Sequence, residues 1–89
     1  MTTRTVTIVN PLGLHARAAA RFVQAASAFA SHVRVAAGRC TMDGKSIMGL
    51  LLLAAAQGTR VEISAEGLDE GEAVDALCAL VERGFESCA

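Results

Sequence analysis

The sequence predicts a two-layer α/β sandwich, with a four-stranded, mainly antiparallel sheet and three helices on one face. Its 89 residues are enough for a single domain with one core. Four short segments alternate apolar and polar side chains, which is typical of antiparallel strands that bury only one face. Three helical segments separate or follow them in the order β-α-β-β-α-β-α, and they would cover the apolar face.

The first strand is expected from Arg4 to Val9, where Val6 and Ile8 share one face. Turn residues follow, and then an alanine-rich stretch over 16–28 favours a helix because alanine has the best helix propensity. The spacing of apolar residues within it predicts a buried stripe formed by Ala19, Phe22, Val23 and Ala26.

A second alternating stretch begins at Ser31, and Gly38 turns the chain into a short third strand over 40–42. Asp43-Gly44 ends that strand. Ser46 then precedes an apolar run over 47–54 and is interpreted as the N-cap of a second helix, since a serine oxygen can accept an N–H of the first turn.

The fourth strand is predicted over 59–66, with Val61, Ile63 and Ala65 inward. Asp69 is expected to cap a third helix, with Glu72 three residues later completing a capping-box-like pair. The buried stripe of this helix is predicted to comprise Val74, Leu77, Leu80 and Val81, and Gly84 is expected to mark its end.

Composition and charge narrow the classes of function. The net charge is −1 and there is no Trp or Tyr, which argues against nucleic-acid binding. Residues 1–42 carry five arginines and no acid, giving +5, whereas residues 43–89 carry three basic residues against nine acids, giving −6. The basic half therefore favours a partner with an acidic surface.

The cysteines and the apolar segments predict a reduced protein of the cytoplasm. Cys40, Cys78 and Cys88 are odd in number and widely spaced, which fits neither a zinc site nor a disulfide framework. The longest apolar run, over 47–56, is about half the ~20 residues that span a bilayer, and no signal-peptide pattern begins the chain. We expect neither a metal, nor a cofactor, nor membrane insertion.

The segment Asn10-Pro11-Leu12-Gly13-Leu14-His15-Ala16-Arg17 places His15 where a turn becomes a helix. The first turn of a helix favours anions, yet it holds Arg17, and no acid offsets Arg17 or Arg21. A lone histidine is more often an ordinary surface or core residue, and His32 on a strand is interpreted in that way. At His15, however, an imidazole, free N–H groups and a guanidinium converge, which suits a phosphate-sized anion and disfavours a metal. A neutral imidazole is also a competent nucleophile toward phosphorus.

This segment, followed by Ala18-Ala19, resembles the active-site signature of the HPr family, the histidine phosphocarriers of the bacterial phosphoenolpyruvate-dependent phosphotransferase system. The segment Asp43-Gly44-Lys45-Ser46-Ile47-Met48-Gly49-Leu50 resembles the second signature of that family, and the resemblance covers essentially the whole chain. It implies a monomeric carrier without independent turnover. Enzyme I would pass a phosphoryl group from phosphoenolpyruvate to Nδ1 of His15, Arg17 would steady it, and an Enzyme IIA domain would receive it.

One residue departs from the family pattern. Ala18 stands where the family commonly has a proline, which puts in doubt only how rigidly the helix start is held.

Ser46 has two interpretations. It is a helix N-cap that needs no further role, or, as the resemblance implies, it is phosphorylated for regulation by an HPr kinase/phosphorylase. Phosphate at an N-cap gains from the helix dipole and from Lys45, but its charge would disturb an acidic partner near His15.

A docking patch for partners is also expected on the second helix. Ile47, Leu50 and Leu53 can turn toward the core, whereas Met48 and Leu51 share a different face. Exposed apolar residues are nevertheless common and need no function. The predicted partner-binding residues are Ala20, Arg21, Gln24, Ile47, Met48 and Leu51.

Several functions stay open at this point. A sugar-uptake carrier and a carrier of the nitrogen-related regulatory branch would share the same chemistry. A regulatory binding module acting through phospho-Ser46 is a separate class, disfavoured because His15 is retained. A third class, a sandwich that binds metal or nucleic acid, is disfavoured because the sequence lacks the necessary ligand spacing and aromatic residues.

Overall fold

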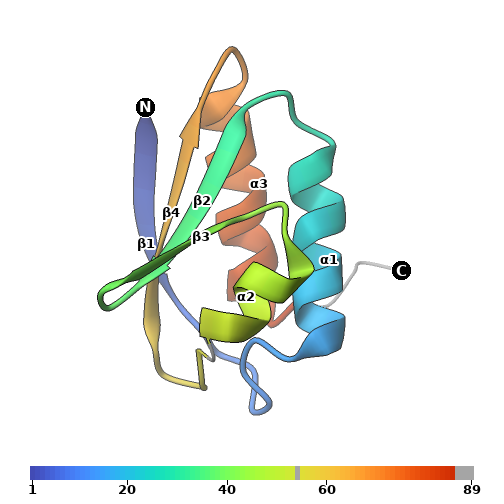
Figure 1. Ribbon diagram of the computed structural model, residues 1–89, viewed down its shortest axis with the longest axis vertical. Coiled ribbons are helices and arrows are strands. Elements are labelled where there is room, and N and C mark those ends of the chain that lie inside the picture. Colours follow the sequence, from blue (N-terminus) through green and yellow to red (C-terminus); the bar gives the residue numbers. More distant parts are fainter. Residues whose placement is uncertain (54, 86–89) are drawn as a thin grey trace.

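The computed structural model describes residues 1–53 and 55–85. Its elements follow the predicted order, β-α-β-β-α-β-α (Figure 1). They are β1 (Thr2–Thr7), α1 (Ala16–Ser27), β2 (His32–Ala37), β3 (Cys40–Asp43), α2 (Ile47–Leu53), β4 (Arg60–Glu66) and α3 (Glu70–Glu82).

The four strands form one open sheet in the order β1-β4-β2-β3, and every neighbouring pair is antiparallel. The last strand in the chain therefore lies between the first two, with Val6 opposite Val61 and Val35 opposite Ile63. The three helices cover one face of this sheet (Figure 1). The predicted fold class is confirmed.

The core lies between the sheet and the helices. Buried residues alternate with exposed ones over 32–35 of β2 and 60–63 of β4, as expected for strands with one face in water. The largest fully buried side chains come from both layers: Phe22, Ile8, Leu50, Ile63, Leu77, Val33, Val74 and Val81.

The predicted boundaries needed small shifts. β1 begins and ends two residues earlier than expected, but Ile8 still donates to the Thr59 carbonyl at 2.9 Å and is buried as predicted. α2 is described to Leu53, and the predicted last residue, Ala54, lies outside the described residues. α3 ends at Glu82, and Gly84 has the positive φ expected where the helix stops.

The capping box predicted at α3 is wrong. Asp69 occupies the N-cap position, but its side chain makes no hydrogen bond to its own helix. Its carboxylate instead accepts the Ala30 and Ser31 backbone N–H groups, each at 2.9 Å, and the Ser31 hydroxyl. These bonds lower the pKa of Asp69, the Ser31 hydroxyl most of all. The side chain thus joins the start of α3 to the α1–β2 loop.

Candidate functional site

The loop before α1 is fixed by backbone hydrogen bonds and by the Asn10 side chain, which donates to the Gly13 carbonyl. Gly13 donates to the Asn10 carbonyl at 3.0 Å, and Leu14 donates to the Ala55 carbonyl at 2.8 Å. Gly13 has φ +66°, and a Cβ there would lie 2.5 Å from the Ala55 oxygen, so only glycine fits. The loop therefore sets where α1 begins.

His15 is the N-cap of α1, as predicted. Its backbone is extended, with φ −83° and ψ 179°, and its carbonyl accepts the Ala19 N–H at 2.8 Å. Its imidazole makes no capping bond, and no first-turn residue is acidic. The first-turn N–H groups, which have no intrahelical partners, and the ring nitrogens both remain available for an anionic group.

The imidazole borders an open hollow of about 230 Å³ that α1 shares with the end of α3. This volume is below the ~300–1,000 Å³ typical of small-molecule pockets, so the hollow suits a small group held on a side chain better than a free substrate. Its lining residues are Leu12, His15, Arg17, Ala18, Arg21, Gly84 and Phe85.

The far wall of the hollow is the turn that ends α3. Gly84 donates to the Val81 carbonyl and Phe85 to the Leu80 carbonyl, each at 2.9 Å, which is the hydrogen-bond pattern of a Schellman motif. Phe85 is buried and has φ +65°, a conformation uncommon for a residue other than glycine. The Arg21 guanidinium donates to the Phe85 carbonyl at 3.0 Å and thereby ties this wall to α1.

This wall was missed in the sequence because it lies about 70 residues from His15, and Gly84 alone indicated only a helix end. The bond also changes the interpretation of Arg21. It was predicted as a partner-binding residue together with Gln24, which is exposed, but Arg21 is half-buried and part of the wall. Ala20 is half-buried on the same helix.

Ser46 caps α2, as predicted. Its hydroxyl accepts the Gly49 N–H at 3.1 Å, and its carbonyl accepts the Leu50 N–H at 3.1 Å. The neighbouring Lys45 ammonium donates to the Phe29 carbonyl at 2.8 Å. Its charge is therefore held between the β3–α2 turn and the α1–β2 loop.

The orientation predicted for α2 is partly wrong. Leu50 is fully buried, as expected, but Ile47 is 44% exposed and does not face the core. Met48 is 69% exposed, whereas Leu51 is half-buried against the core, and the exposed leucine is Leu52 instead. α2 packs beside α1 on the helical side of the sheet (Figure 1), and its exposed large apolar residues are Ile47, Met48 and Leu52.

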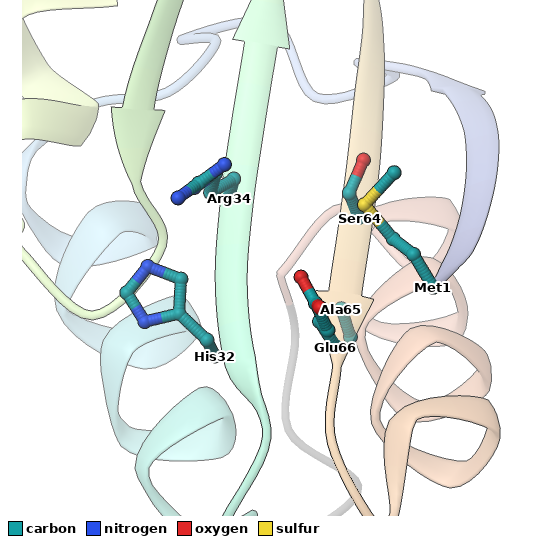
Figure 2. A pocket seen from close by; sticks show the side chains of 6 residues that line it. All are labelled: Met1, His32, Arg34, Ser64, Ala65 and Glu66. Atoms are coloured by element: carbon teal, nitrogen blue, oxygen red, sulfur yellow. The ribbon is translucent and has the colours of Figure 1, made fainter.

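His32 lies elsewhere, on the exposed face of the sheet. It stands on β2 beside Arg34 and opposite Glu66 of β4 (Figure 2). The depression that these residues line holds about 10 Å³, room for roughly one water molecule. The structure therefore brings His15, but not His32, together with an uncapped helix start.

Other types of site are unsupported by the geometry. No three His, Cys, Asp or Glu side chains of residues 1–53 and 55–85 are placed to hold a metal ion. In the same ranges, no helix has the length and apolar character needed to cross a membrane. Cys40 is exposed, Cys78 is buried with its pKa raised by desolvation, and Cys88 lies outside the described residues.

Comparison with known protein families shows to which family this chain is related. Residues 2–83 match the family described as "PTS HPr component phosphorylation site". The chain belongs to the HPr family. It is 48% identical over 85 residues to phosphocarrier protein HPr of Neisseria meningitidis serogroup A, covering 96% of both chains. It is also 40% identical over 83 residues to phosphocarrier protein NPr of Shewanella violacea, covering 93% of this chain and 91% of that one.

Solved HPr structures share the fold. The crystal structure of HPr-C-His from Thermoanaerobacter tengcongensis superposes with a TM-score of 0.92 at 48% sequence identity, covering 98% of this chain and 99% of that chain. The resemblance noted in the two sequence motifs thus extends to the whole HPr fold.

Proposed function

We propose that this protein accepts a phosphoryl group on His15 from Enzyme I, with phosphoenolpyruvate as the original donor, and passes it to an Enzyme IIA domain. The observation that carries the proposal is the start of α1, where the His15 imidazole is not used as a cap and borders a hollow with Arg17. Membership of a phosphocarrier family supports it. The protein would act as a monomeric single domain in the cytoplasm.

In the transfer step, the Nδ1 lone pair of a neutral His15 forms a bond to phosphorus while the bond between phosphorus and the donor breaks. The leaving group keeps the electron pair of that bond. The negative oxygens then lie against the first-turn N–H groups of α1 and the Arg17 guanidinium. The second transfer reverses these roles, and the carrier has no turnover of its own.

The partner surface proposed here combines α1 and α2. Its apolar part comprises Ile47, Met48 and the exposed part of the Leu51 side chain. Leu12 and Leu52, which are 77% and 66% exposed, extend it. Ala20 and Gln24 border it, and Arg17 supplies positive charge for an acidic partner. Arg21 contributes as a wall of the hollow.

Regulation at Ser46 is the finer part of the proposal. The hydroxyl is half-buried and engaged with Gly49, so a kinase such as HPr kinase/phosphorylase would have to take it from the cap. A phosphate there keeps acceptor oxygens for the N–H groups of α2, so the helix tolerates it. Its charge lies between Lys45 and Met48 and opposes an acidic partner.

One experiment tests the carrier function directly. The protein is incubated with Enzyme I and phosphoenolpyruvate, and its intact mass is measured before and after mild acid treatment. We expect a gain of one phosphoryl group that acid removes, because phosphohistidine is acid-labile. The His15→Ala variant is the control. Stable phosphate on wild type, or any gain on this variant, would contradict the assignment.

A second function is favoured by the similarity to an NPr protein. In that case the acceptor would be the Enzyme IIA of the nitrogen-related branch rather than one for sugar uptake. Measuring initial transfer rates from the phosphorylated carrier to both acceptor types separates the two. The faster acceptor identifies the branch. A regulatory module acting through phospho-Ser46 alone would transfer to neither.

A further inference from the structure

The Gly13 carbonyl, two residues before His15, accepts two hydrogen bonds. One comes from the His15 backbone N–H at 3.0 Å, and the other comes from the Asn10 side-chain amide nitrogen at 2.6 Å. The side chain of Asn10 and the backbone of His15 therefore share one acceptor. Any rotation of the Gly13 peptide group moves the point to which His15 is held.

This arrangement leaves one atom of the Asn10 side-chain amide without a hydrogen bond. Its Oδ1 atom is buried and has no hydrogen-bond partner within the part of the chain that the structure describes. A buried acceptor without a partner is destabilising, and the hydrogen bond from the amide nitrogen to the Gly13 carbonyl offsets that cost. Rotating the amide by half a turn would place Oδ1 against the Gly13 oxygen, two acceptors facing each other. The observed orientation is therefore the one that fixes the Gly13 carbonyl.

Asn10 also lies near the far wall of the hollow, because a Cβ built on Gly84 would be 3.5 Å from the Asn10 Cβ. Gly84 lines the hollow together with His15. The Asn10 side chain is therefore close to both sides of the site.

We infer that Asn10 is a positioning residue for phosphoryl transfer, acting through the Gly13 carbonyl on the N-cap conformation of His15. The inference rests on the proposed function, because it concerns the geometry of the same imidazole. Without the amide donor, the Gly13 carbonyl keeps only the His15 N–H and the loop loses one of its restraints. Small displacements of a reacting group reduce rates by up to about a hundredfold, whereas docking on α2 is unaffected.

The test compares Asn10→Ala and Asn10→Asp with a matched control. Gln57 is the control because its side-chain amide also donates to a carbonyl of this segment, that of Val9 at 3.0 Å, but not to Gly13. Transfer from Enzyme I is measured as a function of carrier concentration. We expect kcat to fall about tenfold for Asn10→Ala with KM unchanged, and a larger fall for Asn10→Asp. Gln57→Ala should keep both constants.

Backbone amide spectra provide a readout that does not depend on activity. In Asn10→Ala, the amide resonances of Gly13 and His15 should shift strongly, while those of α2 stay in place. In Asn10→Asp at neutral pH the introduced carboxylate cannot donate, but once protonated it can. Lowering the pH should therefore move the His15 amide of this variant back toward its wild-type position. The same titration of Asn10→Ala serves as the reference.

The outcomes separate this inference from the proposed function. If wild type takes up no phosphate, the carrier proposal fails, and unshifted Gly13 and His15 amides in both Asn10 variants would then overturn the structural basis of the inference as well. If wild type is phosphorylated and Asn10→Ala has the same kcat as wild type, only the inference fails. A rise in KM at constant kcat would assign Asn10 to docking and would also overturn it.

Discussion

The residues that begin α1 and α2, His15 and Ser46, occupy the same N-cap position but use their side chains in opposite ways. At α2 the Ser46 hydroxyl is occupied, since it accepts the Gly49 N–H. At α1 the His15 imidazole makes no capping hydrogen bond. The start of this helix is held instead by the surrounding loop, through Gly13, Leu14 and Ala55. Under the proposed function, the side chain that reacts has no structural role, whereas the side chain that would carry a regulatory phosphate has one.

This difference makes the two positions separable by experiment. Replacing His15 should change chemistry and not stability, whereas replacing Ser46 should change stability. The Asp69 start of α3 is a third case, because its side chain serves a neighbouring loop rather than its own helix.

The largest effect is expected for His15→Ala. This variant should take up no phosphate from Enzyme I, because no other side chain of the hollow offers an imidazole nitrogen. Since the ring makes no capping bond, the free energy of unfolding should stay within about 0.5 kcal/mol of wild type. Uptake is measured by intact mass and stability by urea denaturation. His32→Ala is the control and should transfer normally. An inactive His32 variant beside an active His15 variant would reverse the assignment.

Arg17→Ala should have the next largest effect. Arg17 is exposed, lines the hollow and has no acid beside it in the first turn, so its loss leaves the helix intact. Losing a charge-assisted contact of about 1.5–3 kcal/mol in the transition state slows transfer roughly ten- to a hundredfold. Rapid-quench kinetics measure this rate, with Gln24→Ala as an exposed control on the same helix. Equal rates for wild type and Arg17→Ala would remove the guanidinium from the mechanism.

Ser46→Asp should have a smaller effect, on affinity. Aspartate is as good an N-cap as serine, so the melting temperature should hold or rise slightly. Its charge should raise the apparent KM for Enzyme I about fivefold at low salt, corresponding to ~1 kcal/mol for an exposed charge pair, and added salt should reduce the defect.

Ser46→Ala is the matched variant for this measurement. It should lower the free energy of unfolding by about 1 kcal/mol through loss of the cap, without changing KM. Steady-state transfer at two ionic strengths, together with melting curves, checks both variants. An unchanged KM for Ser46→Asp at low salt would place Ser46 outside the partner footprint.

The smallest effect concerns pH and the third helix start. The hydrogen bonds from Ser31 and Ala30 hold the pKa of Asp69 below its ordinary value of 3.8. A carboxyl group with a lower pKa in the folded state adds stability above the unfolded pKa, and loses it as the pH falls through the folded pKa. Unfolding free energy should therefore decline below about pH 4, and it should decline less steeply in Asp69→Asn. Parallel slopes for the two proteins would show that Asp69 is not the group responsible.

The elements of this fold follow from local pattern, and so does the position of His15. Alternation and helical spacing depend on neighbours in sequence, which is why all seven elements were predicted in order. The predictions failed where contacts with residues distant in sequence determine the structure. Asp69 prefers donors about 40 positions away to its own first turn.

The orientation of α2 failed for a related reason. A seven-residue helix has too few turns for its apolar spacing to define a face, and its contacts with α1 and β3 expose Ile47 and Leu52. The wall formed by Gly84 and Phe85 is set by how α3 packs, which no local pattern reports.

The central position of β4 has a consequence for how the protein is made. Of the described strand pairs, only β2–β3 joins neighbours in sequence, because β1 and the other edge of β2 both pair with residues 60–66. The hollow forms later still, because its far wall includes residues 84 and 85. His15 therefore lacks the surroundings described here until these distant residues have folded against α1.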